Sequence, residues 1–167
     1  MNVVISLGAN LGSPETQLAR ARDAISELAG CRCVAQSSLY RTEPVDVSAD
    51  DAHLSFLNAI VVIETSHSPE ELMDALSDLE RREGRMRGEQ ANAPRTLDLD
   101  LILAGEHVIE SDGLTIPHPR WRSRRFVLQP LAEIRPDLRD PVTGRSVSEL
   151  LRELPERPGV ELYKENW

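Results

Sequence analysis

The sequence predicts an α+β fold: a ferredoxin-like βαββαβ core with an antiparallel sheet, helices on that sheet, and a C-terminal hairpin and helix extension. Two observations support this prediction. Four apolar, strand-like runs and two segments of helical period follow one another in the order strand, helix, strand, strand, helix, strand. In addition, no linker, repeat or low-complexity tract interrupts the 167 residues, so we expect a single domain over 1–167.

The first half of the chain supplies three strands and one helix. The run "NVVISLGAN" is apolar and β-branched and ends in a glycine-containing loop. Ser13 and Pro14 have the residue types of an N-cap and a first helical position. Apolar residues then repeat with helical spacing as far as Gly30, at Leu18, Ala21, Ile25 and Leu28. Further strands are predicted over 33–42 and 55–65.

The second half begins with the clearest helix, "SPEELMDALSDLERREG". Ser68 and Glu71 form a capping box around a proline, and the apolar stripe consists of Leu72, Ala75, Leu76 and Leu79. A strand is expected from residue 97, followed by a hairpin over 101–115. A final helix is predicted over 146–154, where Ser146 and Glu149 have the spacing of a second capping box.

Composition excludes several classes of protein. The formal net charge of −9 argues against nonspecific binding to nucleic acid or to an anionic membrane. No apolar run approaches a membrane span, and "MNVVISLGAN" is too short and too uncharged for a signal peptide. Cys31 and Cys33, the only cysteines, are expected to be packing residues under reducing conditions. We therefore expect a cytoplasmic monomer that binds small molecules, without nucleic-acid or membrane partners.

Asp98 and Asp100 alternate with leucines in the stretch "APRTLDLDLILAG", residues 93–105. Residues i and i+2 of a β-strand point to the same face, so the two carboxylates share a face, with Cα atoms roughly 6.5–7 Å apart. The opposite face is expected to carry Leu97, Leu99, Leu101 and Leu103. Two like charges this close need water or a cation. The pair is either a half-solvated strand face or a divalent metal site, whose oxygen ligands suit Mg²⁺.

Positive charge gathers around this acidic pair. Residues 81–125 hold nine arginines and seven acidic residues, a balance of +2, whereas the rest holds ten basic and 21 acidic residues, a balance of −11. Arg95 precedes the pair, and Arg85 and Arg87 lie in a stretch without an apolar pattern. These arginines either pair with the aspartates or bind a ligand of negative charge. A polyphosphate with magnesium fits both halves, because the metal neutralises the aspartates and the arginines neutralise the phosphates.

Further candidates come from a basic segment and from the few aromatic residues. The segment "IPHPRWRSRRF" contains His118 and Arg124. A histidine between prolines is either structural or, beside phosphate-binding arginines, a donor to a phosphate oxygen. Phe56 and Phe126 are two of only six aromatic residues. They either pack in the core or enclose a flat heterocycle between them.

Six short motifs occur in order along the chain: "YRTEPV" at 40–45, "FLNA" at 56–59, "GRMR" at 84–87, "PRTLDLDLIL" at 94–103, "LTIPHP" at 114–119 and "RRFVLQPL" at 124–131. The combination of "PRTLDLD" with a following "PHP" is highly specific. With these motifs the chain resembles the 6-hydroxymethyl-7,8-dihydropterin pyrophosphokinase family of the folate pathway. The resemblance covers nearly the whole chain, from "SLGANLG" to the end of the basic segment.

The resemblance implies a ferredoxin-like fold and transfer of the β,γ-pyrophosphoryl unit of ATP to the pterin hydroxymethyl group, with release of AMP. It implies that two Mg²⁺ ions are held by Asp98 and Asp100, and that the catalytic residues are Arg85, Arg95, Asp98 and Asp100. The implied ATP-binding residues are Arg85, Arg87, Arg95, Thr115, His118 and Arg124. The implied pterin-binding residues, of which the two phenylalanines would stack on the ring, are Thr42, Pro44, Val45, Phe56, Asn58 and Phe126.

The sequence departs from the family pattern at three positions. Asn92 stands where the family commonly has a tryptophan, two residues before the proline of "PRTLDLD". Pro119 replaces a tyrosine, and Gly113 an arginine, that some members carry. These departures imply changed contacts to the pterin and to ATP, whereas the aspartate pair and the loop arginines are retained.

Two other functions remain alternatives. A nucleotidyl transferase with a paired-aspartate metal site on a ferredoxin-like sheet would also use magnesium and ATP, but it would release pyrophosphate instead of AMP. A ferredoxin-like module that binds a small ligand or RNA would have no activity. The acidic net charge and the strand aspartates disfavour RNA.

Overall fold

The computed structural model describes residues 1–43, 55–83, 97–157 and 159–167. Within these ranges the elements in chain order are β1 (Asn2–Ala9), α1 (Pro14–Glu27), β2 (Cys31–Gln36), β3 (Leu39–Thr42), β4 (Phe56–Thr65), α2 (Pro69–Arg82), β5 (Asp98–Ala104), β6 (Ile109–Ser111), β7 (Leu114–Ile116), a 3-10 turn η1 (Trp121–Ser123), α3 (Arg125–Ile134), α4 (Val147–Glu153) and β8 (Val160–Lys164). No helix in these ranges combines the length and the apolar character that a membrane span needs.

One antiparallel sheet organises these elements. Its strand order is β5-β1-β4-β3-β8, and β2 pairs with the part of β4 that β3 leaves uncovered. The central pair of β1 and β4 runs in register from Asn2↔Glu64 to Ala9↔Leu57. With β5 beside β1, and β2 and β3 beside β4, this order is that of the predicted βαββαβ core. The strands β6 and β7 form a separate hairpin.

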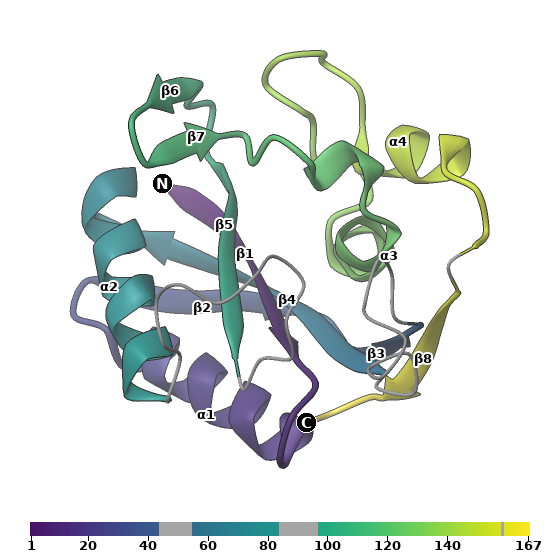
Figure 1. Cartoon of the computed structure of the whole chain (residues 1–167). Coiled ribbons are helices and arrows are strands. Elements are labelled where there is room, and N and C mark those ends of the chain that lie inside the picture. Colours follow the sequence, from purple (N-terminus) through teal and green to yellow (C-terminus); the bar gives the residue numbers. More distant parts are fainter. Residues whose placement is uncertain (44–54, 84–96, 158) are drawn as a thin grey trace.

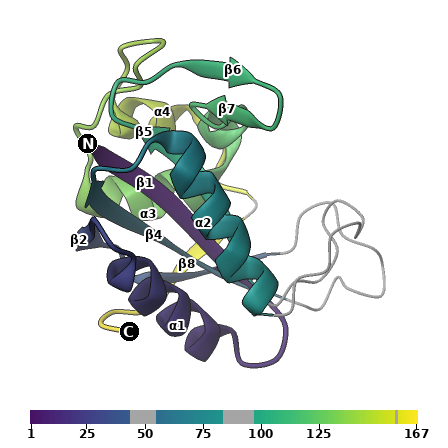
Figure 2. The same ribbon diagram turned by 90° about the vertical axis from the view of Figure 1, so that its left-hand side faces the viewer.

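Helices cover both faces of the sheet, as Figures 1 and 2 show. On one face, α1 and α2 pack over a core to which β1 contributes Val3, Ile5, Leu7 and Ala9. On the opposite face, α3 and α4 pack over a second core, to which the sheet contributes Val4, Ile60, Val62, Ile102 and Leu103. Cys31 and Cys33 are half-buried free thiols packed against the first core, which confirms their expected packing role.

The predicted N-cap residues agree with the structure, although one of them makes no capping hydrogen bond. Both capping boxes form: the hydroxyls of Ser68 and Ser146 accept from the backbone N–H groups of Glu71 and Glu149, and the two carboxylates accept from the serine N–H groups. Ser13 takes the N-cap position of α1, but its side chain makes no capping hydrogen bond. The N-cap residue type therefore identified where this helix begins without supplying the cap.

Two strand predictions need correction. The strand expected over 33–42 is broken into β2 and β3, because the Ser37 hydroxyl, instead of a backbone carbonyl, accepts the Ile60 N–H at 2.9 Å. The hairpin expected over 101–115 is instead formed by β6 and β7, since β5 continues to Ala104. The helix α3, which contains Pro130, and the strand β8 were not predicted.

A β-bulge changes the expected face of one leucine. Leu97, Leu99 and Leu101 lie in the core under α1 and α2, as predicted, but Leu103 lies in the opposite core. The register of β5 against β1 shifts between Ile5↔Leu101 and Val4↔Leu103, so Ile102 is an extra residue in the ladder. The extra residue reverses the alternation after it, and the displaced Ile102 carbonyl accepts the N–H of His118 at 2.9 Å.

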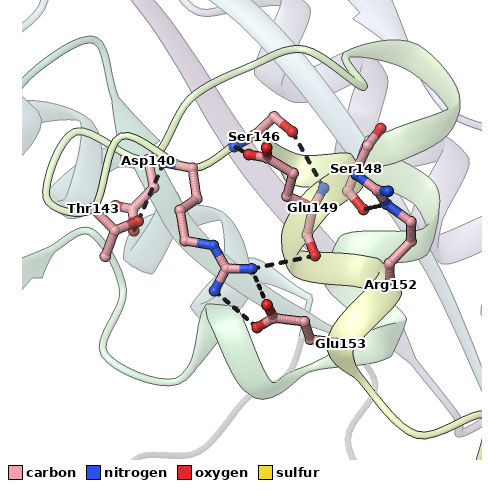
Figure 3. A network of polar contacts seen from close by, with 8 residues as sticks. Asp140, Thr143, Ser146, Ser148, Glu149, Arg152 and Glu153 are labelled. Atoms are coloured by element: carbon pink, nitrogen blue, oxygen red, sulfur yellow. Dashed lines mark hydrogen bonds and ion pairs between the residues drawn. The ribbon is translucent and has the colours of Figure 1, made fainter.

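A buried aspartate fixes the turn before α4 (Figure 3). Asp140 is fully buried and accepts hydrogen bonds from Nε and Nη2 of Arg122, at 2.6 and 2.8 Å, and from the Thr143 hydroxyl at 2.6 Å. Burial raises the pKa of Asp140, but the bonds from Arg122, Thr143 and the Val142 N–H outweigh it and lower the pKa to about 2.

Asp140 is expected to make the protein sensitive to acid. Its pKa is lower in the folded chain than in the unfolded chain, so its contribution is complete well above the ordinary pKa of 3.8 and declines as the pH falls toward about 2. The decline amounts to about 2 kcal/mol. Urea unfolding from pH 5 to pH 2 measures it, with Asp140→Asn as the control. The variant is expected to be less stable at pH 5 and to lose less stability on acidification. Equal losses in the two proteins would contradict this role.

Candidate active site

Asp98 and Asp100 lie at the start of β5, side by side on one face. In the ladder with β1, Asp98 stands opposite Gly8 and Asp100 opposite Ser6. Paired residues of adjacent strands point to the same face, and Val4 of β1 shows that this is the face under α3 and α4. The two β1 residues beside the carboxylates have no side chain or a small one. The predicted sharing of one face by the two aspartates is therefore confirmed.

Two basic side chains from the segment before α3 approach Asp100. Nη1 of Arg124, the N-cap residue of α3, donates to Asp100 Oδ2 at 3.0 Å. Nε2 of His118 lies 3.9 Å from the same oxygen. The arginine and histidine side chains are each 17% exposed and that of Asp100 is 32% exposed. The cluster is thus partly open to solvent, and a ligand can reach it.

The surroundings of His118 determine its protonation. Its Nδ1 accepts the Arg120 N–H at 3.1 Å, so in the neutral ring the proton is on Nε2, which faces Asp100. Burial lowers the pKa of His118, the Asp100 carboxylate raises it, and Arg124 and Arg120 lower it again. The net shift is downward, so the imidazole is neutral at pH 7 and presents an N–H donor to the site.

A second polar group lies two strands away from Asp98. Nδ2 of Asn58 on β4 donates to Oγ1 of Thr42 on β3 at 2.8 Å, and both residues are 5% exposed. Gly8 lies between Asn58 and Asp98 in the sheet. A Cβ atom on Gly8 would lie 3.1 Å from Asn58 Oδ1 and 4.0 Å from Asp98 Cβ. The glycine thus leaves an open strip of backbone between the amide and the acidic pair.

The remaining described candidates surround these two groups. Phe56 is half-buried and pairs with Thr42 in the ladder. It lies two residues before Asn58 on β4, so the two side chains share one face of the sheet. Phe126 is half-buried in the first turn of α3, 5.5 Å from the Arg124 guanidinium. Thr115 is exposed on β7, two residues before the Pro117 that precedes His118. Gly113 forms the turn before it with φ +88°, a conformation that favours glycine.

Five site residues predicted from the sequence lie outside the described residues: Pro44, Val45, Arg85, Arg87 and Arg95. Asn92, the departure from the family pattern, lies outside them as well.

Two contributors to the site were missed in the sequence. Gly8 is the first glycine of "SLGANLG". Nothing in that motif indicates that Asn58 would be its neighbour in the sheet. Glu80 of α2 is 7% exposed, and its carboxylate accepts the Leu99 N–H at 2.7 Å. That bond fixes the peptide between Asp98 and Leu99. Glu80 lies on the buried stripe with Leu72 and Leu76, and a charged residue at that spacing was the available signal.

The aspartate pair fits magnesium in a particular way. Within the ranges that the structure describes, no group of three or more histidine, cysteine, aspartate or glutamate residues has the arrangement of a metal site. Magnesium is commonly held by one or two carboxylates together with substrate phosphates and water. Two carboxylates beside a glycine and a serine match that mode, in which the other ligands come from a bound phosphate chain.

The fold and the site define a class: a small α+β domain with two carboxylates, an arginine and a histidine at one end of an antiparallel sheet. The model of the 7,8-dihydro-6-hydroxymethylpterin-pyrophosphokinase (HPPK) family matches residues 4–136, more than half of the chain. The chain belongs to this family.

Relatives of similar length agree with the family match. The chain is 41% identical over 153 residues to 2-amino-4-hydroxy-6-hydroxymethyldihydropteridine pyrophosphokinase of Pseudomonas aeruginosa. The aligned region covers 92% of this chain and 91% of the relative. It is 43% identical over 130 residues to the protein of the same name from Bacillus subtilis, covering 78% and 75%.

A solved structure supports the fold. The chain superposes on Plasmodium falciparum HPPK-DHPS with a TM-score of 0.71, at 15% identity over 91% of this chain. The match takes up 44% of that longer chain, so this chain spans less than half of the solved protein.

Gly8→Ala is expected to destabilise the protein by about 1–3 kcal/mol, because the new Cβ presses against Asn58 Oδ1. Thermal unfolding measures the cost. The matched control is the same substitution in an Asn58→Ala background, where the crowded oxygen is absent and the cost is expected to be smaller. An equal cost in both backgrounds would show that the crowding lies elsewhere.

Proposed function

We propose that this chain transfers the β,γ-pyrophosphoryl unit of ATP to the hydroxymethyl group of 6-hydroxymethyl-7,8-dihydropterin, in folate biosynthesis. The products are the pterin diphosphate and AMP. The observation that carries the proposal is the convergence of Arg124 and His118 on Asp100, beside Asp98, in a chain of this family. The names of the relatives support the same activity.

Asp98 and Asp100 are proposed to hold two Mg²⁺ ions. Magnesium, when bound, neutralises phosphate charge and holds the nucleotide against β5. Arg124 now pairs with Asp100, and we infer that it turns part of its hydrogen-bonding capacity to phosphate when the carboxylate binds metal. A guanidinium has five N–H donors and suits both partners.

The ATP side of the site is proposed to extend along the basic segment. The neutral His118 donates a hydrogen bond from its Nε2–H to a phosphate oxygen. The hydrogen bond that Nδ1 accepts from the Arg120 N–H supports this role, because it leaves the ring proton on Nε2. Thr115, on β7, is proposed to contact ATP as well. Arg85, Arg87 and Arg95 are assigned to ATP from the sequence alone, with Arg85 and Arg95 stabilising charge on the transferred group and on its leaving oxygen.

The pterin side is proposed to lie on β3 and β4. Asn58, oriented by Thr42, pairs with the polar edge of the pterin. The backbone at Pro44 and Val45, which follow β3 in the sequence, is proposed to pair with the same edge of the pterin. Phe56 and Phe126 stack on the two faces of the ring. Phe56 lies on the sheet and Phe126 on α3, the helix that packs over the same face of the sheet, which supports the assignment.

The chemistry needs positioning more than a protein nucleophile. The pterin hydroxyl oxygen forms a bond to the β-phosphorus, the bond from that phosphorus to the oxygen bridging the α-phosphorus breaks, and AMP leaves with that oxygen. The hydroxyl proton passes to water or to a phosphate oxygen. The residues of the chain orient the two substrates and neutralise the charge on the phosphates.

We further propose that the chain acts as a cytoplasmic monomer and as one domain over 1–167, with small molecules as its partners. Pairing of β8 with β3 supports the single domain, because it joins the last strand to the sheet of the first.

Incubation with ATP, magnesium and 6-hydroxymethyl-7,8-dihydropterin tests the activity. AMP and the pterin diphosphate are expected in equal amounts. Release of pyrophosphate would instead identify a nucleotidyl transferase, and the absence of turnover together with RNA retention on a filter would identify a binding module.

Asp100→Ala is expected to reduce turnover by roughly two to four orders of magnitude, because one metal ligand and the partner of Arg124 are lost together. The fold is expected to survive, since the side chain is one-third exposed on an edge strand. Steady-state AMP formation and thermal unfolding measure the two effects. Turnover like that of the unmodified protein would contradict the assigned role.

A further inference from the structure

The C-terminal arm, residues 159–167, runs antiparallel along β3 (Figure 1). Its strand β8 pairs with β3 from Thr42↔Val160 to Leu39↔Lys164. The family match ends at residue 136, so the arm lies outside the part of the chain that the family model covers. The arm is nevertheless the immediate neighbour of the strand that carries Thr42.

Both ends of the arm are attached to residues that flank β3. At one end, the Glu43 N–H donates to the Gly159 carbonyl oxygen, and the Gly159 N–H donates to the Glu43 carboxylate, each at 3.3 Å. At the other end, Trp167 Nε1 donates to the Ser37 carbonyl oxygen at 2.8 Å. The arm therefore holds β3 along its whole length.

The helix α1 fixes the far end of the arm. The Arg22 guanidinium lies 4.9 Å from the centre of the Trp167 ring and donates to the Trp167 carbonyl oxygen. Lys164 forms an ion pair with Glu15 of the same helix. A cation over an indole face and a hydrogen bond together make Trp167 the best-anchored residue of the arm.

The position of β3 decides how Asn58 is oriented. Thr42 stands between Phe56 of β4 and Val160 of β8, and its hydroxyl accepts from Asn58 Nδ2. Without the arm, β3 would be an edge strand of four residues with one row of backbone groups unpaired. A shift of β3 would draw the Thr42 hydroxyl away and allow the carboxamide of Asn58 to turn.

We propose that the C-terminal arm is a positioning element for the pterin substrate, and that Trp167 is the residue that anchors it. The arm holds β3, and β3 through Thr42 holds the Asn58 carboxamide that reads the polar edge of the pterin. This inference rests on the proposed function. Asp100, His118 and Arg124 lie on β5 and before α3, away from the hydrogen bonds of the arm, so binding of ATP is expected to be unaffected.

The test compares three variants of the full chain. Trp167→Ala removes the ring and the indole N–H, whereas Trp167→Phe keeps a ring beneath Arg22 and removes the hydrogen bond to Ser37. Leu151→Ala is the matched control, because Leu151 belongs to α4 and packs on the core under α3 and α4, so its truncation weakens the fold from an element other than β3 and the arm. The measurements are kcat, KM for each substrate, the dissociation constant of the pterin in the presence of an unreactive methylene analogue of ATP, and the NMR signals of the Asn58 side-chain amide.

Trp167→Ala is expected to raise the KM and the dissociation constant of the pterin roughly tenfold, with kcat and the KM for ATP within about twofold, since a small misplacement of a binding group is costly. Trp167→Phe is expected to give a smaller shift of the same kind, and it decides the matter should Trp167→Ala fail to fold. Both are expected to shift the Asn58 amide signals, and Leu151→Ala is expected to lower only the unfolding temperature.

Equal losses for ATP and pterin, or a pterin constant unchanged in both Trp167 variants, would overturn the inference. An equal rise in Leu151→Ala would do the same, because it would show a general loss of stability. If the unmodified protein itself fails to bind the pterin, it is the proposed function that fails.

Discussion

Repulsion between two neighbouring carboxylates is the constraint on which the site depends. Asp98 and Asp100 project from one face of β5 and are separated along the strand by Leu99, which points into the opposite core. Segments distant in the sequence contact Asp100 or the peptide between the two aspartates. Arg124 and His118 approach Asp100 from the segment before α3, and the buried carboxylate of Glu80 fixes the intervening peptide from the other side. The position of the acidic pair thereby ties β5 to two helical segments.

The same sheet face is apolar at one end and polar at the other. Under α3 and α4 it carries Val4, Ile60 and Ile102. Ser6 and Asp100 lie level with Ile60 in the ladder, and Gly8, Asn58 and Asp98 lie two residues further along each strand. The β-bulge at Ile102 marks the boundary on β5. It turns both Ile102 and Leu103 toward the helices and presents the Ile102 carbonyl to the N–H of His118. One irregularity thus completes the core and places a site residue.

What the sequence predicted correctly was local. Capping boxes involve residues three apart, and the shared face of Asp98 and Asp100 follows from an alternation of two, so both could be derived without knowing the neighbours. The errors came from distant partners. Leu103 was assigned to the wrong face because the bulge depends on pairing with β1, and β2 and β3 were read as one strand because Ser37 bonds to Ile60 of another strand. α3 was missed because Pro130 and the arginines before it hide an apolar stripe.

The importance of Gly8 could not be predicted for the same reason, and it connects the two halves of the site. Adjacent strands lie about 4.8 Å apart, so Asn58 on β4 and Asp98 on β5 are separated by roughly 10 Å across β1. A substrate that reaches both must cross the backbone at Gly8. A Cβ atom there would lie 3.1 Å from Asn58 Oδ1 and would stand between the amide and the acidic pair. The absence of a side chain at one position therefore allows the amide that would orient one substrate and the carboxylates that would hold the other to serve a single reaction.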